Sequence, residues 1–245
     1  MRKKPFTYLG LITAAGRGKR MGALTRTNNK SLFLINNTPL ISHIINVFKK
    51  FKFEKIFIVT GYQSEKVVKV IGNEANCVFN ASYSNSGILV SIQKVRSKLQ
   101  GKSFIFSPGD HFFKSNVMES LLNTSGDIRI VIQKKKKYSK DDAKVIIKNA
   151  KIIEMGKNIP EVHATGEFTG IAYFSEKVSK FFFKEIDDLI KNGFVNAYVM
   201  DVIIRMNQKY GFIINYSYCK ENSRIEIDSV SDLIHAREIA KNLTQ

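Results

Sequence analysis

Short apolar runs alternate with amphipathic segments along the first half of the chain. Each apolar run ends at glycine or polar residues, a pattern typical of buried strands. The segments between the runs have the apolar spacing of helices. Strands are expected at residues 8–14, 55–60, 77–79 and 103–107, and helices at 40–51, 64–71 and 88–99. Thr38 and Pro39 suit the N-cap and first turn of the first helix. This alternation predicts a parallel sheet with right-handed crossovers.

The second half mixes short β-type runs with helices. We expect β segments at residues 128–132, 145–147, 168–174, 212–216 and 224–228, and helices at 178–190, 196–208 and 230–243. With only 4 prolines and no long Gly/Ser tract, no part of the chain resembles an interdomain linker. The sequence therefore predicts one α/β domain over residues 1–245. Its sheet is Rossmann-like, open and mostly parallel, flanked by helices, with β insertions in the second half.

The chain is strongly basic, with a formal net charge of +18 and a pI near 9.8. A field of this sign attracts nucleotides, nucleic acids and anionic lipids alike. The densest basic run, Lys134 to Lys137, has the character of a solvated loop. A nucleic-acid-binding protein would interleave basic residues with aromatic ones along one element, and this run does not. We keep nucleic-acid binding only as a remote alternative.

The two cysteines, Cys77 and Cys219, lack metal-type spacing and lie in apolar segments, so we expect buried free thiols. The apolar stretch at residues 9–15 is short and runs directly into a basic glycine-rich turn, which is unlike a cleavable signal segment. No segment has the ~20 apolar residues of a membrane span. The sequence thus predicts a cytoplasmic protein without membrane insertion.

A glycine-rich basic turn follows the first predicted strand. Gly16 and Gly18 allow backbone amides to approach phosphate oxygens closely, and the neighbouring Arg17, Lys19 and Arg20 supply positive charge. Lys30 lies ten residues after Arg20, within reach of the same anion. These residues indicate a triphosphate-binding turn, and the alternative is a basic turn without a ligand.

Two familiar phosphate-binding patterns do not fit this turn. A dinucleotide-binding fold would place an acidic residue about 20 residues further on, where residues 35–37 are Ile, Asn and Asn. Its second strand would also come much earlier than residues 55–60. A Walker-type loop would have Ser or Thr where Arg20 follows Lys19.

Two aspartates are candidate metal ligands. Asp110 directly follows the predicted strand at residues 103–107, and ligands of open α/β sheets bind at the carboxyl ends of strands. Asp228 lies far along the chain, and two converging carboxylates together with substrate phosphates satisfy Mg²⁺. A turn aspartate and a helix N-cap are the alternatives for Asp110 and Asp228, and the basic turn favours metal ligands. His111 has no required role, because a phosphate nucleophile is already anionic, and its contact with substrate stays open.

The segments Leu11-Ile-Thr-Ala-Ala-Gly-Arg-Gly-Lys-Arg-Met-Gly, Leu24-Thr25, Lys30-Ser31-Leu32 and Pro39-Leu40-Ile41 together carry a resemblance. They resemble the nucleotidyltransferases that activate sugar 1-phosphates, phosphocholine and inositol phosphate, and the resemblance covers essentially the whole chain. One position departs from the pattern, since Asn29 precedes Lys30 where the family usually has proline.

The resemblance implies the nucleotide-diphospho-sugar transferase type of fold. Residues 1–125 would form the nucleotide-binding half and residues 126–245 the acceptor-binding half. It implies catalytic roles for Arg20 and Lys30, and metal ligation by Asp110 and Asp228. The implied nucleotide-binding residues are Ala14, Ala15, Gly16, Gly18, Lys19, Asn85 and Gly87, and the implied acceptor-binding residues are Lys157, Glu167, Gly170 and Asp201.

The implied reaction is Mg²⁺-dependent transfer of a nucleoside monophosphate from an NTP to a small phosphorylated acceptor, with release of pyrophosphate. The length and the Gly-Asp-His turn at residues 109–111 look most like cytidylyltransferases acting on alcohol phosphates. CTP is therefore the favoured nucleotide and an alcohol phosphate or sugar 1-phosphate the acceptor. A guanylyl-, uridylyl- or thymidylyltransferase for a sugar 1-phosphate is the alternative. The sequence leaves a homodimer open.

Overall fold

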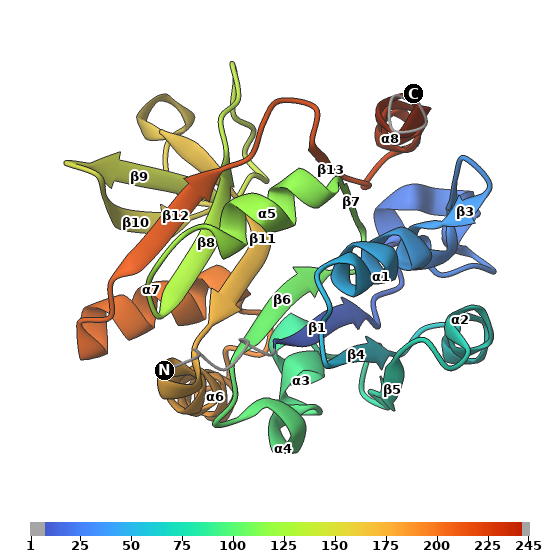
Figure 1. The fold of residues 1–245 in the computed structure, drawn as a ribbon, viewed down its shortest axis with the longest axis horizontal. Coiled ribbons are helices and arrows are strands. Elements are labelled where there is room, and N and C mark those ends of the chain that lie inside the picture. Colours follow the sequence, from blue (N-terminus) through green and yellow to red (C-terminus); the bar gives the residue numbers. More distant parts are fainter. Residues whose placement is uncertain (1–7, 242–245) are drawn as a thin grey trace.

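A computed structural model of the protein describes residues 8–241, and these residues form a mixed sheet covered by helices (Figure 1). At the centre of the sheet, β1 (Leu9–Ala14) pairs in parallel with β4 (Lys55–Thr60) and β6 (Phe104–Pro108). A further parallel strand, β5 (Asn76–Phe79), forms one edge. Leu11 and Ile12 of β1 enter different apolar clusters on the two faces of the sheet. Burial on both faces explains why the central strands are continuous apolar runs.

The second half extends the same sheet with largely antiparallel strands. The long strand β11 (Gly166–Phe174) pairs with β6, β8 (Ile128–Gln133) and β9 (Lys144–Lys148). A hairpin joins β9 to β10 (Lys151–Gly156), and β12 (Ile214–Tyr218) lies parallel to β8. The expected mostly parallel α/β sheet with β insertions in its second half is therefore confirmed.

Helices cover both faces of the sheet (Figure 1). One face packs against α3 (Ile88–Gln93), α6 (Glu176–Lys191) and α7 (Val199–Tyr210), which bury residues such as Phe182 and Met200 in the larger cluster. The other face packs against α1 (Leu40–Lys50), α2 (Ser64–Ile71) and α5 (Ser115–Leu122). A smaller apolar cluster joins α8 (Val230–Lys241) to the start of α1 and to Phe112.

Some expectations about local structure were wrong. Thr38 and Pro39 form β3, which pairs with β2 (Leu34–Ile35), so Thr38 is not a helix N-cap. The helix α1 begins at Leu40, whose N–H donates to the carbonyl of Phe33. The helix expected at residues 88–99 is interrupted near Val95 and continues as α4 (Arg96–Leu99). Also unexpected were α5 and β7 (His111–Phe113), which pairs with β13 (Arg224–Glu226). The last positions of the helix expected at 230–243 lie outside the described residues.

Both cysteines are free, as expected, although only Cys219 is buried and Cys77 on the edge strand β5 is half-buried. Within residues 8–241, no helix combines the length and apolar character that crossing a membrane requires.

A buried charge cluster, not anticipated from the sequence, ties α6 to α7. The carboxylate of Glu185 is fully buried and accepts hydrogen bonds from Arg205 Nε at 3.1 Å, Lys209 Nζ at 2.8 Å and the Tyr210 hydroxyl at 2.5 Å. Burial alone would raise the pKa of Glu185, but hydrogen bonds from Lys209, Tyr210 and Arg205 outweigh it and lower that pKa. One carboxylate thus holds together two helices that cover the sheet.

Replacing Glu185 with alanine should destabilise the protein without changing turnover by the folded fraction. The loss should be about 2–3 kcal/mol, below the usual cost of breaking a buried pair because the cationic partners are partly exposed. For a chain of this size it corresponds to a fall in Tm of about 5–10 °C. Thermal unfolding checks this, with Asp188→Ala as the control, because Asp188 also contacts Lys209 but is more exposed. Equal effects of the two substitutions would contradict the special role of Glu185.

Candidate active site

A cavity of about 1010 Å³ opens at the carboxyl ends of the central parallel strands. The end of β6 and the turn that follows it form part of the wall through Pro108 and Asp110, and Arg20 comes from the segment after β1. The turn after β6 is joined to the end of β1, since the N–H of Gly109 donates to the carbonyl of Thr13 at 2.9 Å. A Cβ on Gly109 would lie 2.7 Å from that carbonyl oxygen, so this close approach requires glycine. The cavity therefore occupies the edge of the sheet at which α/β proteins bind ligands.

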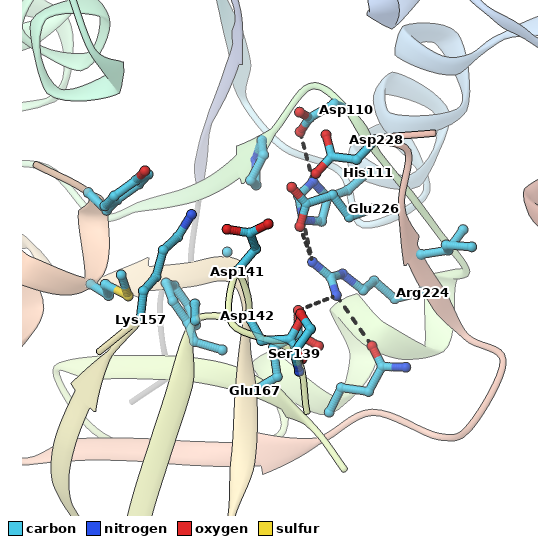
Figure 2. A pocket seen from close by; sticks show the side chains of 18 of the residues that line it. Asp110, His111, Ser139, Asp141, Asp142, Lys157, Glu167, Arg224, Glu226 and Asp228 are labelled. Atoms are coloured by element: carbon cyan, nitrogen blue, oxygen red, sulfur yellow. Dashed lines mark hydrogen bonds and ion pairs between the residues drawn. The ribbon is translucent and has the colours of Figure 1, made fainter. Parts of the chain in front are cut away.

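The two aspartates singled out in the sequence meet at one side of this cavity (Figure 2). Lys30 Nζ donates to Asp110 Oδ2 at 3.1 Å and to Asp228 Oδ1 at 2.6 Å. The pairing of β7 with β13 brings the distant segments together, and it continues in a hydrogen bond from the N–H of Ile227 to the carbonyl of Asp110 at 2.9 Å. The structure thus places the three residues in direct contact.

Asn29, the position that departs from the family pattern, fixes the approach of Lys30. Its buried amide donates to the carbonyls of Ala14 at 2.9 Å and Tyr62 at 2.8 Å. Its oxygen accepts from the N–H of Ser31 at 2.9 Å, as the cap of the short 3-10 helix Lys30–Leu32. Hydrogen bonds from asparagine therefore anchor this segment to the end of β1, where a proline would have supplied only a restricted backbone.

A third carboxylate, Glu226, adjoins the pair and was not singled out in the sequence. Oxygens of Asp110, Glu226 and Asp228 lie within 4.8 Å of one another. The signal was present in the spacing, because alternate residues of an extended segment face the same side and Glu226 precedes Asp228 by two. Carboxylate oxygens are the ligands that Mg²⁺ prefers. These three side chains, close together and partly exposed at the cavity, therefore fit a divalent cation.

The charges in this cluster control one another. Burial alone would raise the pKa of Asp110, but the Lys30 ammonium and the hydrogen bond from His111 hold that pKa well below its usual range. Asp228 behaves similarly: Lys30 lowers its pKa in spite of burial. Burial acts to lower the pKa of Lys30, yet Asp110 and Asp228 raise it overall. Glu226 has its pKa raised, first by burial and also by the negative charge of Asp110. At neutral pH, Asp110, Asp228 and Lys30 are therefore all charged.

The basic turn after β1 lies beside this cluster. Arg20 pairs with Asp228 Oδ2 at 2.8 Å, although 60% of its side chain stays exposed. The guanidinium carbon Cζ of Arg17 instead lies 5.5 Å from the ring centre of Tyr62. Of the remaining predicted nucleotide-binding residues near this turn, Ala14 and Ala15 are buried, Gly18 is half-buried, and Gly16 and Lys19 are exposed. The exposed guanidinium of Arg20 is well placed to meet an anion in the cavity.

The two glycines of this turn should respond differently to alanine. Gly18 has φ +65°, and a Cβ there would lie 3.0 Å from Lys30 Cε, whereas a Cβ on Gly16 would meet no atom within 4 Å. Gly18→Ala should therefore cost about 1–2 kcal/mol, a fall in Tm of about 3–6 °C. Gly16→Ala should leave Tm unchanged and raise only the KM for the nucleotide. Thermal unfolding and initial rates separate the two effects, and a loss of stability in Gly16→Ala would contradict the interpretation.

The far end of the cavity carries Lys157, which follows β10. Lys157 Nζ lies 4.4 Å from the ring centre of Tyr198, and both side chains line the cavity. Gly170 also lines it, at a bulge of β11 where φ is +80°. A Cβ on Gly170 would lie 2.7 Å from Pro108 Cγ, so β11 approaches the end of β6 closely only with glycine there. Gly170 lies nearer the carboxylate cluster, because the same Cβ would be 3.7 Å from Nε2 of His111. We call the part of the cavity at Lys157 and Tyr198 the Lys157 end.

Glu167 lines the cavity too, but its carboxylate is buried and already paired. It accepts from Arg224 Nη1 at 3.1 Å, and Lys135 Nζ lies 2.6 Å from its other oxygen. Lys135 also donates to Asp142, so the lysine-rich run is not the fully solvated loop that was expected. The buried Lys144 supports the same loop by donating to the carbonyls of Ser139 and Lys140. The segment after β8 is therefore fixed beside Glu167, and Lys135, Ser139 and Asp142 of this segment line the cavity.

Several predicted binding residues do not line the cavity. Of the basic turn only Arg20 lines it, whereas Ala14, Ala15, Gly16, Gly18 and Lys19 do not. Asp201 and Asn85 also lie outside the lining. Asp201 does not line the cavity, because its carboxylate accepts from the N–H of Tyr198 at 2.7 Å and caps the start of α7. Asn85 is exposed in the turn before α3 and also lies outside the cavity lining. Gly87 does line the cavity, and its N–H donates to the carbonyl of Val195 at 3.1 Å.

The fold and this charged cavity define a nucleotidyltransferase, and comparison with known proteins agrees. Residues 10–154 match the MobA-like NTP transferase domain, and the chain belongs to this family. The chain is 26% identical over 238 residues to the choline-phosphate cytidylyltransferase of Streptococcus pneumoniae, covering 95% of this chain and 98% of that one. It is also 26% identical over 235 residues to the 2-aminoethylphosphonate cytidylyltransferase of Lancefieldella rimae, covering 91% and 89%.

Structural comparison supports the fold. The inositol-1-phosphate CTP transferase of T. maritima superposes with a TM-score of 0.76 at 19% identity, over 98% of both chains. By contrast, the chain spans only 26% of the length of another relative, the bifunctional protein GlmU of Methanococcus maripaludis.

Proposed function

We propose that the protein is a Mg²⁺-dependent cytidylyltransferase that transfers CMP from CTP to a small phosphorylated acceptor, either an alcohol phosphate or a sugar 1-phosphate. An oxygen of the acceptor phosphate attacks the α-phosphorus of CTP, forming a new P–O bond, and the bond to the β-phosphate oxygen breaks to release pyrophosphate. The attacking oxygen is already anionic, so no general base is required. The two nearly full-length relatives described above are both cytidylyltransferases, which supports CTP as the donor.

The roles follow from charge and position. Arg20, exposed beside Asp228, would neutralise the triphosphate and the departing pyrophosphate. Lys30 would move its ammonium from the carboxylates toward the α-phosphate, and Lys157 would hold the acceptor phosphate at the other end of the cavity. Asp110 and Asp228, with Glu226 beside them, would hold Mg²⁺, which supplies charge neutralisation and orients the α-phosphate. Catalysis would consist mainly of positioning and electrostatic stabilisation.

The observation that carries this proposal is that Asp110 and Asp228, both hydrogen-bonded to Lys30, line a cavity that Lys157 also lines. The test crosses the four common NTPs with a panel of phosphorylated alcohols and sugar 1-phosphates, with and without Mg²⁺, and measures released pyrophosphate. The panel includes phosphocholine and inositol 1-phosphate, and the phosphonate 2-aminoethylphosphonate is added to it. We expect release only with Mg²⁺ and most rapidly with CTP, and mass spectrometry should show the CMP adduct of the acceptor.

The same screen decides the alternative. Faster release with GTP, UTP or dTTP and a sugar 1-phosphate would replace the cytidylyl proposal by a guanylyl-, uridylyl- or thymidylyltransferase. Running Asp228→Asn in parallel controls for contaminating pyrophosphate-releasing enzymes, since that variant should be inactive with every pair.

A further inference from the structure

Arg224 is a buried arginine beside the carboxylate cluster, where it lies between Glu226 and Glu167 (Figure 2). Its side chain is 3% exposed. Nη1 donates to Glu167 Oε1 at 3.1 Å, while Nη2 contacts Nε2 of His111 and lies 3.4 Å from Glu226 Oε2. Burial alone would lower the pKa of Arg224, but the charge of Glu167 raises it, so the guanidinium is charged. A fixed positive charge therefore faces one nitrogen of the His111 ring.

This contact determines which nitrogen of His111 carries hydrogen. A guanidinium has only donors, so Nε2 of His111 must accept the hydrogen bond from Arg224. In the neutral ring the hydrogen then resides on Nδ1. Nδ1 lies 2.9 Å from Asp110 Oδ1, an oxygen that can only accept while the carboxylate is ionised. The chain of contacts thus runs in one direction, from Arg224 through His111 to Asp110.

Both oxygens of Asp110 are consequently held. Oδ1 accepts from His111 and Oδ2 accepts from Lys30 at 3.1 Å. If Lys30 turns toward a bound nucleotide, the hydrogen bond from His111 is the contact that still fixes the carboxylate. Partners of metal-binding groups that orient them in this way commonly control metal affinity.

We infer that His111 and Arg224 are positioning residues: Arg224 selects the Nδ1–H tautomer of His111, and His111 holds Asp110 in the orientation that binds a divalent cation. This inference rests on the proposed role of Asp110 as a metal ligand. It assigns His111 a function other than contact with substrate. It also explains why a buried arginine adjoins the cluster without itself approaching Asp110 or Asp228.

The tautomer can be read directly in the wild-type protein. Long-range ¹H–¹⁵N correlation spectra in mildly alkaline buffer distinguish a protonated from an unprotonated ring nitrogen. The chain has 4 histidines, so the signals of His111 are assigned by their loss in His111→Asn. We expect hydrogen on Nδ1 and a bare Nε2. A ring with hydrogen on Nε2 overturns the inference, whatever any substitution does to folding.

Metal affinity tests whether His111 holds Asp110 in the orientation that binds a cation. Mn²⁺ alone is the probe, and its binding is measured by calorimetry or by Mn²⁺ electron spin resonance. His111→Phe removes both nitrogens and should weaken Mn²⁺ binding about 10- to 100-fold. His111→Asn places an amide N–H where Nδ1–H stands, attached to the same γ-carbon, and should restore binding to about the wild-type value. Melting temperatures of both variants are measured, because a purely structural histidine would give Mn²⁺ affinities that follow stability.

Asp110→Asn separates failure of the inference from failure of the proposed function. Weaker Mn²⁺ binding in Asp110→Asn but unchanged binding in His111→Phe overturns the positioning role and leaves the metal site intact. Unchanged binding in Asp110→Asn overturns the metal site and the inference together. If Mn²⁺ binding is weakened in Asp110→Asn and in His111→Phe but is restored in His111→Asn, the result supports both the metal site and the positioning role of His111.

Discussion

Lys30→Met should abolish nucleotidyl transfer and should also destabilise the protein whenever divalent cations are chelated. Lys30 is 7% exposed and is the shared partner of Asp110 and Asp228, which are 33% and 22% exposed. Without the ammonium, two nearby carboxylates remain partly buried; Asp228 keeps only the exposed Arg20 as a cationic partner, and Asp110 keeps only its hydrogen bond from His111. We expect turnover to fall about 10²–10³-fold, as when a preorganised site loses a charged donor. Stability should fall by about 3 kcal/mol, the lower limit for a broken buried pair.

The pH dependence of this effect has a definite sign. In the wild type, Lys30 keeps the pKa values of Asp110 and Asp228 low, so its stabilisation is present above about pH 4 and is lost as these groups protonate in acid. In Lys30→Met, burial and mutual repulsion raise those pKa values, and protonation instead relieves the repulsion. The difference in Tm between the proteins should therefore be largest near neutral pH and shrink toward about pH 4.

Thermal unfolding with EDTA or with excess Mg²⁺ provides the measurement. The cation should restore most of the Tm of Lys30→Met, because it binds the same carboxylates, but it should not restore turnover. Lys30→Arg retains the charge and serves as the matched control for stability. Equal Tm values for wild type and Lys30→Met in EDTA would show that the ion pairs contribute little and that the explanation is wrong.

Much of the fold could be predicted because the central strands are buried on both faces and therefore stand out as apolar runs. The hairpin of β2 and β3 could not be found from apolar spacing, since each strand has two residues. A different signal was available. Asn36 and Asn37 both have positive φ, at 48° and 66°, and an Asn-Asn pair suits a two-residue hairpin turn. Thr38-Pro39 matched a helix start locally, but strand pairing decided its structure.

The candidate site shows where inference from sequence alone ends. Asp110 could be predicted because it follows an apolar strand, and Lys30 because it follows the basic turn. Arg224 and Glu185 acquire their roles through tertiary pairing, and no local pattern marks them. For Glu226 the only local signal is its spacing of two residues from Asp228. Asp201 shows the opposite error, since an aspartate near a predicted helix start fits a cap at least as well as a binding residue. Its contact with the N–H of Tyr198 favours the cap.

Asp110→Asn and Asp228→Asn should each reduce turnover by about 10²–10³-fold while changing Tm little, because the amide keeps the size of the side chain and one carboxylate still pairs with Lys30. Chelation by EDTA should abolish activity of the wild type, and Mg²⁺ should restore it. Glu226→Gln should have a smaller effect, since Glu226 does not contact Lys30 in the described structure. Initial rates at saturating CTP and acceptor, with Tm for each variant, give the comparison.

The matched control is Asp201→Asn, which removes a carboxylate of the same kind from the cap of α7 rather than from the cluster. It should lower Tm slightly, by the loss of about 1 kcal/mol typical of a cap, and leave turnover near that of the wild type. If Asp201→Asn instead raises the KM for the acceptor, that carboxylate does reach the substrate, and the cap is not its main role. Full activity in either Asp110→Asn or Asp228→Asn contradicts the metal site directly, because no other pair of carboxylates among residues 8–241 shares Lys30.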